Sequence, residues 1–213
     1  MTTAHLPDEI ADQLAHLNKY LPESRERPRI LAFVSSNPGE GTSTCIANFA
    51  RYVAEHLERS VLLIDGNLRT PGLHDAAGVP RRNGLAELLG GAIELSDAVK
   101  RTSVPNLSLI TSGENGESPQ RLLDRALIQE RLLNQARGYD YLLLDCPPVN
   151  RYSESTVLAS LCDGVVLVVL GESTRREVAA RAKQDLLDAK CRLLGVFMNK
   201  RKFYIPKSLY QRL

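Results

Sequence analysis

The chain has 213 residues, of which 43% are hydrophobic and 24% are charged, and its net charge is +2. These values are ordinary for one globular domain, and the charge is too small to indicate a nucleic-acid-binding protein. The cysteines lie far apart without a C-x-x-C pair, so we expect no metal site or disulfide and predict a reduced, cytoplasmic setting. The longest apolar run, Val165 to Leu170, is too short to cross a bilayer, so any membrane contact is expected through a partner.

Apolar periodicity predicts alternating helices and strands along the chain. A short amphipathic helix over residues 7–20 and a polar connector make up an N-terminal segment, 1–28, which precedes a domain at 29–198 and a basic tail at 199–213. Strands that alternate with helices pair in parallel, so an α/β fold with three α/β/α layers and a mainly parallel sheet is expected. The predicted strands are 30–34, 61–65, 107–111, 141–145, 165–170 and 193–198; the predicted helices are 43–57, 84–89, 95–101, a longer one from 118 onward, and 174–189; a loop covers 66–83.

A glycine-rich turn follows the first predicted strand of the domain. Between a strand and a helix, such a turn directs backbone N–H groups and the positive end of the helix dipole toward one point, which suits a phosphate. The P-loop pattern G-x-x-x-x-G-K-[ST] fits at Gly41 and Ser43, but Thr42 occupies the lysine position. The candidate phosphate-binding residues are Gly39, Glu40, Gly41, Thr42, Ser43 and Thr44.

Polar side chains end two of the buried strands. Asp65 and Asp145 each close an apolar run, and Asn67 follows two residues after the first. Ligands bind at the carboxyl ends of strands in open parallel sheets. In P-loop enzymes an aspartate at this place holds Mg²⁺ and a second can accept a proton. Ser43, Asp65 and Asp145 are therefore the candidate magnesium ligands, and Asp65 and Asp145 the candidate catalytic residues.

Three segments, taken together, resemble the Walker A, A′ and B boxes of bacterial tyrosine kinases (BY-kinases), of the MinD/ParA-like P-loop class. They are Ser-Ser-Asn-Pro-Gly-Glu-Gly-Thr-Ser-Thr44, Leu-Leu-Ile-Asp65-Gly-Asn67-Leu-Arg69 and Leu-Leu-Leu-Asp145-Cys-Pro-Pro. The resemblance implies a P-loop NTPase-like fold, ATP or ADP with Mg²⁺ as cofactors, and a role in capsule or exopolysaccharide synthesis. It also implies that Arg69 contacts the nucleotide and that Asn199 reads the adenine base.

Two family positions are substituted in this chain. The family has lysine where Thr42 stands and a second aspartate where Asn67 stands. Losing a charge-assisted phosphate contact removes roughly 1.5–3 kcal/mol of binding, and more in a transition state. Arg69, Arg51 or a residue of another subunit are the candidate replacements for the lysine.

The resemblance also extends to partners and to the tail. The family's N-terminal E-x-x-R-x-x-R pattern is absent from the segment starting at Glu9, so its ring is not expected here, although another homo-oligomer stays open. Tyr204 and Tyr210 are the candidate phosphoacceptors, with packing of the tail as the alternative. The implied partner is the cytoplasmic end of a membrane chain-length determinant, a polysaccharide co-polymerase, which would hold the protein at the inner membrane.

Three functions follow from this sequence. The favoured one is a catalytically impaired pseudokinase that regulates the co-polymerase, because Thr42 and Asn67 affect the same chemistry. An active tyrosine autokinase or ATPase with a reorganised site is the alternative, supported by Ser43, Asp65 and Asp145. A MinD/ParA-like positioning ATPase is the more distant one.

Overall fold

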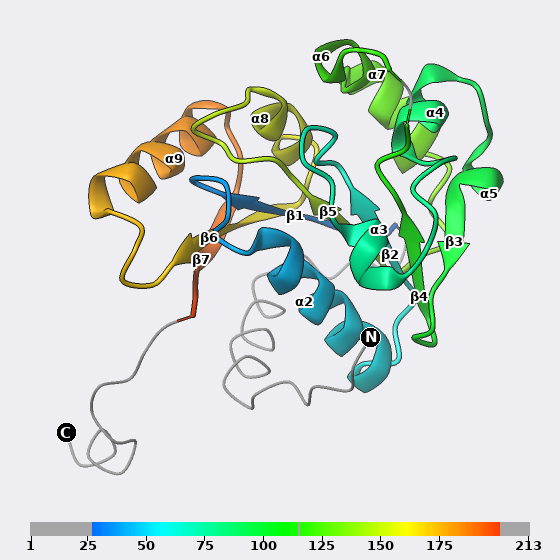
Figure 1. Cartoon of the computed structure of the whole chain (residues 1–213), viewed down its shortest axis with the longest axis horizontal. Coiled ribbons are helices and arrows are strands. Elements are labelled where there is room, and N and C mark those ends of the chain that lie inside the picture. The colour runs from blue at the N-terminus through cyan, green and yellow to red at the C-terminus, as the bar shows by residue number, and fades with distance from the viewer. Residues whose placement is uncertain (1–26, 115, 201–213) are drawn as a thin grey trace.

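The computed structural model describes residues 27–114 and 116–200, and within them a seven-stranded sheet forms the centre (Figure 1). The strand order is β3-β4-β2-β5-β1-β6-β7, with every neighbouring pair parallel except β3 and β4. The strands are β1 (Arg29–Ser35), β2 (Val61–Asp65), β3 (Val99–Arg101), β4 (Leu107–Ile110), β5 (Tyr141–Asp145), β6 (Gly164–Leu170) and β7 (Leu193–Asn199).

Helices cover both faces of the sheet. The helical elements are α2 (Thr42–His56), α3 (Leu73–Ala77), α4 (Leu85–Gly90), α5 (Leu95–Ala98), α6 (Pro119–Leu122), α7 (Arg125–Ile128), η1 (Gln129–Leu133), α8 (Glu154–Ala159) and α9 (Arg176–Asp188). One apolar cluster packs α2 and α3 onto one face, and another packs α4, α7, η1, α8 and α9 onto the opposite face. The three-layer α/β fold and its mainly parallel sheet are therefore confirmed.

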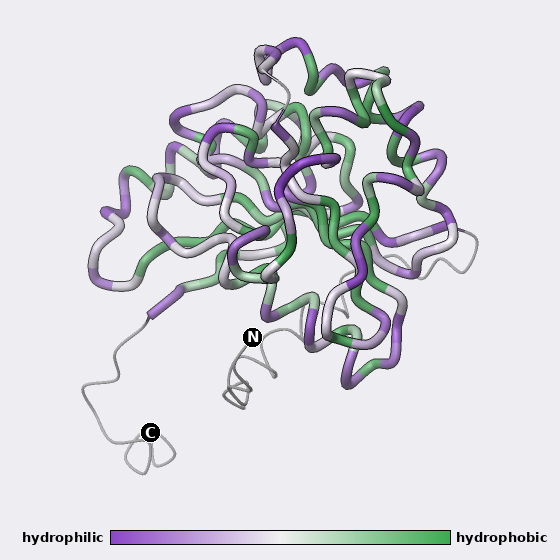
Figure 2. The backbone as a smooth tube through the Cα atoms, turned by 45° about the vertical axis from the view of Figure 1, so that its right-hand side comes forward, coloured by the Kyte–Doolittle hydropathy of each residue, from purple (hydrophilic) through white to green (hydrophobic). Residues whose placement is uncertain are grey.

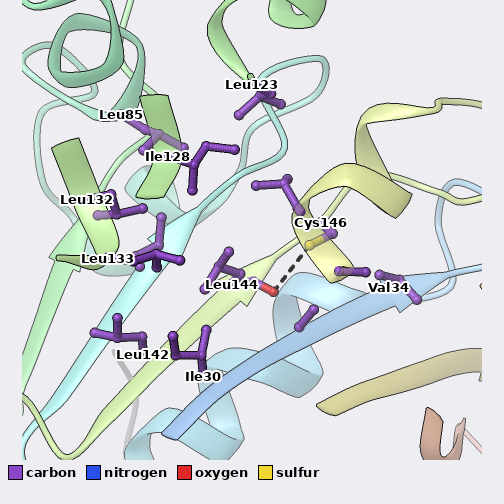
Figure 3. Close-up of a cluster of buried hydrophobic side chains, with 14 of the residues drawn as sticks. Ile30, Val34, Leu85, Leu123, Ile128, Leu132, Leu133, Leu142, Leu144 and Cys146 are labelled. Carbon is purple, nitrogen blue, oxygen red and sulfur yellow. Dashed lines mark hydrogen bonds between the residues drawn. The ribbon is translucent and has the colours of Figure 1, made fainter. Parts of the chain in front are cut away.

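The central strands are buried on both faces because each carries apolar residues at successive positions. Every residue of β2 and β5 is buried. Figure 2 shows this as a hydrophobic centre in the tube, with hydrophilic segments around it. On the α4 and η1 face, Ile30, Leu142 and Leu144 lie toward Leu132 and Leu133 (Figure 3). This continuous core fixes the register of β2 against β5, which positions the polar residues at their ends.

The structure corrects two of the predicted helices and adds two that were not predicted. The helix expected at 95–101 ends at Ala98, and Val99–Arg101 form β3 because they pair with β4. The long helix expected from 118 is divided into α6, α7 and η1, since Asp124 accepts hydrogen bonds from the N–H groups of Ala126 and Leu127 and so begins a new helix. Helices α3 and α8 lie in segments for which no helix was predicted.

No helix within residues 27–114 and 116–200 has the length and apolar content that a membrane span requires. The predicted N-terminal helix, Tyr204 and Tyr210 lie outside the described residues, as does most of the basic tail.

Candidate functional site

The glycine turn joins β1 to α2 as a phosphate loop, Ser36–Gly41. Gly39 and Gly41 have φ angles of +82° and +88°, a left-handed conformation that glycine adopts without strain. The first turn of α2 carries no acidic residue, and no side chain caps it. Its first N–H groups therefore remain available at the positive end of a helix dipole, which is the arrangement that binds anions.

The Glu40 side chain holds the inside of the loop. Its carboxylate is 4% exposed and accepts hydrogen bonds from the N–H groups of Ser36 at 2.7 Å and Asn37 at 3.0 Å. The Thr174 hydroxyl donates to the same carboxylate at 2.5 Å. The Asn199 amide donates to the Glu40 backbone carbonyl at 2.9 Å. Glu40 thus binds the N–H groups at the start of the loop and leaves those at its end for a ligand.

Asp65 and Asp145 lie side by side where β2 and β5 end, because the two residues are partners in the register of these strands. They are 0% and 1% exposed. One oxygen of Asp65 accepts a hydrogen bond from the Leu73 N–H at 3.3 Å. Among the described residues, the other Asp65 oxygen and both oxygens of Asp145 have no hydrogen-bond partner. Buried carboxylate oxygens without a partner indicate a place for a cation.

Both carboxyl groups have raised pKa values. Burial raises the pKa of Asp65 to about 6, although N–H groups of Leu73, Asn67 and Gly72 oppose the rise. Burial, and then the charge of Asp65, raise the pKa of Asp145 well above its usual range, while the nearby Ser43 hydroxyl opposes this. The pair therefore resists full ionisation unless a cation lies between or beside the two groups.

The residues present fit a magnesium ion. Within the described part of the chain, no cluster of three or more His, Cys, Asp or Glu side chains could hold a metal alone. Mg²⁺ does not require one, since it is commonly held by one or two carboxylates together with water and substrate phosphates. Asp65, Asp145 and the Ser43 hydroxyl would hold it, and the ion would neutralise phosphate charge there.

The two arginines suggested as a replacement for the missing lysine are held to different degrees, Arg69 by a buried carboxylate and Arg51 by a partly exposed one. Thr42 begins α2 and is 8% exposed. The Arg69 guanidinium binds the buried Glu154 carboxylate, with Nη2 and Oε1 2.6 Å apart. Arg51 pairs with Glu55 one helical turn further along α2, at 2.9 Å. Both arginines are thus engaged with carboxylates.

Asn67 closes a local turn instead of presenting a carboxylate. Its side-chain oxygen accepts a hydrogen bond from the Thr70 N–H at 3.1 Å, and its amide donates to the Thr70 hydroxyl at 3.1 Å. A neutral amide cannot accept a proton from an attacking hydroxyl at this position.

The carboxyl edge of the sheet brings together most of the predicted site residues. The phosphate loop, Ser43, Asp65 and Asp145 meet there, and Asn199 reaches the loop from the end of β7. Two contributing residues were not predicted. Thr174 binds Glu40 and Glu154 binds Arg69, and each pair is far apart in sequence. The only sequence signal for them was that Thr174 follows β6 and Glu154 follows β5, at the edge where ligands bind.

Comparison with known proteins gives consistent results. Residues 29–199 match the family described as cellulose biosynthesis protein BcsQ. The chain is 35% identical over 168 residues to tyrosine-protein kinase YwqD from Bacillus subtilis, covering 79% of this chain and 70% of that protein. Its structure resembles the VpsO kinase domain, with a TM-score of 0.79, 29% identity, and coverage of 92% of each chain. It also shares its fold with the cell division ATPase MinD of Pyrococcus furiosus, with a TM-score of 0.70 and 23% identity; the match covers 86% of this chain and 78% of the MinD chain.

Proposed function

The chain belongs to the bacterial tyrosine-protein kinase family of the P-loop class, and we propose that within this family it is a regulatory pseudokinase. In this proposal it keeps the kinase fold and part of the nucleotide site but does not transfer phosphate to tyrosine. It acts at the inner membrane as the cytoplasmic partner of a polysaccharide co-polymerase in exopolysaccharide or capsule synthesis.

The observation that carries the proposal is the absence of a cation at Thr42. Phosphoryl transfer depends mainly on positioning and on electrostatic stabilisation of charge in the transition state. Thr42 supplies a hydroxyl instead of an ammonium group, and Arg51 and Arg69 are paired with Glu55 and Glu154. Removing one stabilising donor from such a site typically lowers the rate by about 10²–10³-fold.

Asn67 adds a second and independent loss. A carboxylate at this position would accept the proton of the attacking tyrosine hydroxyl. The Asn67 amide instead makes two hydrogen bonds to Thr70 and has no basic atom to offer. Nucleotide that bound the loop would therefore lack both the charge that stabilises the leaving phosphates and the base that activates the acceptor.

Incubation of the full chain with γ-labelled ATP and Mg²⁺ tests the proposal. We expect no label on Tyr204 or Tyr210 above the level of a variant in which both are phenylalanine. Label that depends on these tyrosines and on Asp145 would overturn the proposal.

The active autokinase remains a second candidate because of one observation. Asp65 and Asp145 keep three carboxylate oxygens without hydrogen-bond partners among the described residues, as a working magnesium site requires. The same labelling experiment separates the two candidates.

A further inference from the structure

We propose that residues 7–21 pack as a helix on a hydrophobic surface of the same chain, formed by α9 and the edge strand β7. We call this surface the β7 face and define it by Leu187, Val196 and Met198. The inference is independent of the proposed function, because it concerns neither the phosphate loop nor the carboxylate pair.

The β7 face is apolar and open to solvent. Among the residues that the structure describes, the exposed large hydrophobic side chains are Leu187 at 44%, Met198 at 50% and Val196 at 54%. Val196 and Met198 pair in register with residues of β6 that belong to the apolar cluster beneath α9. Side chains of partner residues project to the same face of a sheet, so Val196 and Met198 lie on the side that α9 covers.

Leu187 lies on the side of α9 that is turned toward β7. The amide of Asn150 donates to the Val178 carbonyl at 3.1 Å, which marks the side of α9 that faces α8 and the loop before it (Figure 1). Leu187 is nine residues further along α9, or two and a half helical turns, and so lies on the opposite side. Leu187 therefore extends the apolar surface of Val196 and Met198.

The two edges of the sheet differ in their protection. The edge strand β3 has three residues, and two of them are Lys100 and Arg101. The edge strand β7 has seven residues and no charged side chain. Short edge strands with charged residues resist association, whereas a long apolar edge is a template for it. The β7 face therefore has the character of a surface that is covered in solution.

Residues 7–21 have the pattern and the length to cover it. Ile10, Leu14, Leu17 and Leu21 recur at helical spacing and would form one apolar side. A helix over these residues would be about 22 Å long, and a strand of the length of β7 measures about 23 Å. One helix would therefore cover the whole of β7.

The point of attachment brings this segment close to β7. The Arg27 guanidinium binds the Asp163 carboxylate, with Nη2 and Oδ1 2.6 Å apart. Asp163 directly precedes β6 and accepts a hydrogen bond from the Ile30 N–H at 2.9 Å. The segment thus meets the domain at the amino end of β6, and β7 is the next strand, about 4.8 Å away. The connector 22–26 spans up to about 17 Å and is long enough to pass β7.

This attachment also fixes the direction of the helix and its charge pairing. A helix that leaves the amino end of β6 and follows β7 places its beginning at the carboxyl end of the sheet. Two exposed basic residues lie at that end, Arg176 in the first turn of α9 and Lys200 after β7. The acidic residues at the beginning of the predicted helix are Asp8, Glu9 and Asp12.

Net charge favours this segment over the other end of the chain. Residues 1–26 carry five acidic and two basic side chains, a net charge of −3 with neutral histidines. Residues 201–213 carry four basic side chains and no acidic one, so Arg176 and Lys200 would repel them. Opposite charges at a contact select the partner and its orientation.

Hydrogen exchange of the full chain, followed by mass spectrometry at a concentration where light scattering gives the monomer mass, tests the inference. We expect the amides of residues 7–21 to exchange at least tenfold more slowly in the wild type than in the double variant Val196→Lys with Met198→Lys. Gln184→Lys is the control, because Gln184 is on the outer side of α9 and bonds only the exposed Asp188 among the printed contacts of its side chain. It should keep the wild-type exchange.

A second double variant changes the segment and leaves residues 27–200 untouched. Leu14→Asp with Leu17→Asp should lose the same protection, because it removes the apolar side of the helix. Ala15→Asp with Lys19→Asp is the matched control, since it places two aspartates on the side of the helix away from the apolar one and should keep most of the protection. Wild-type exchange of β5 in every variant shows that the domain is still folded.

The remaining outcomes contradict the inference. Fast exchange of residues 7–21 in the wild type would leave the β7 face to another protein. Protection that survives both apolar double variants would place the segment elsewhere. Protection that appears only in samples with the mass of a dimer would mean that the segment of a second copy covers the face.

Discussion

Asp65 combines full burial with a pKa raised to about 6, and this lowers the stability of the folded chain at neutral pH. In the unfolded chain the same group ionises near its ordinary pKa of 3.8, so the folded form binds more protons between these two values. The free energy of unfolding therefore falls as the pH rises through this window, and it stays low above it. The penalty is at most about 3 kcal/mol, because each pKa unit is worth about 1.4 kcal/mol.

We therefore expect Asp65→Asn to be more stable than the wild type at pH 7.5 and to lose most of this advantage at pH 4. Urea unfolding of both proteins at pH 7.5 and at pH 4 measures the difference in their free energies of unfolding. Asp140→Asn is the matched control. Burial alone would raise the pKa of Asp140, but the hydrogen bonds that Ser60 donates lower it overall, so this variant should be less stable at pH 7.5. A wild type more stable than Asp65→Asn at pH 7.5 would contradict the account.

Gly41 is a second residue whose identity the structure explains. Its φ of +88° strains any residue with a side chain, and an added Cβ would also displace the Asn199 amide from its contact with the loop. Gly41→Ala should lower the free energy of unfolding by about 1–3 kcal/mol and abolish ADP binding. Gly138→Ala is the control, since Gly138 has open space around its Cβ position, and its effect should stay within about 0.5 kcal/mol. Equal effects of the two substitutions would contradict a special role for the Gly41 conformation.

At the scale of elements, the pair formed by Arg69 and Glu154 ties the segment after β2 to the first turn of α8. Glu154 is 4% exposed at its side chain, so removing Arg69 leaves a buried carboxylate without its cation. Arg69→Met should lower the free energy of unfolding by about 2–4 kcal/mol, and much of this should return in the double variant with Glu154→Gln.

Arg51→Met provides the comparison, and urea unfolding measures the stability of all these variants. Its partner Glu55 lies on the same helix and is 31% exposed at its side chain, so this substitution should cost about 0.5 kcal/mol or less. If Arg69→Met destabilised the chain as little as Arg51→Met, the Arg69 side chain would be free to move and could replace the lysine.

The sequence predicted the elements whose signal is local. The strands ending at Asp65 and Asp145 are apolar throughout, so their type and their ends were readable. β3 was missed because three residues show no periodicity and the strand forms only through pairing with β4. The hydrogen bond between Thr174 and Glu40 could not be predicted, since it depends on β1 and β6 being neighbours in the sheet.

At the scale of the whole molecule, the fold gathers its polar groups at one edge of an otherwise apolar sheet. β1, β2, β5, β6 and β7 are parallel, so the phosphate loop, the carboxylate pair, Thr174 and Asn199 all lie after or at their carboxyl ends. A core buried to this extent does not depend on the residues at positions 42 and 67. Loss of catalysis without loss of the fold is therefore physically reasonable for this family member.

We propose that Thr42 and Asn67 alone account for the loss of catalysis at a site whose carboxylate pair and phosphate loop are retained. Steady-state hydrolysis of ATP with Mg²⁺ by the wild type and by the double variant Thr42→Lys with Asn67→Asp tests it most directly, and the same double variant with Asp145→Asn serves as the control. We expect the wild type to show no turnover above the control and the double variant to gain at least a hundredfold. Turnover by the wild type at the rate of the double variant would contradict it.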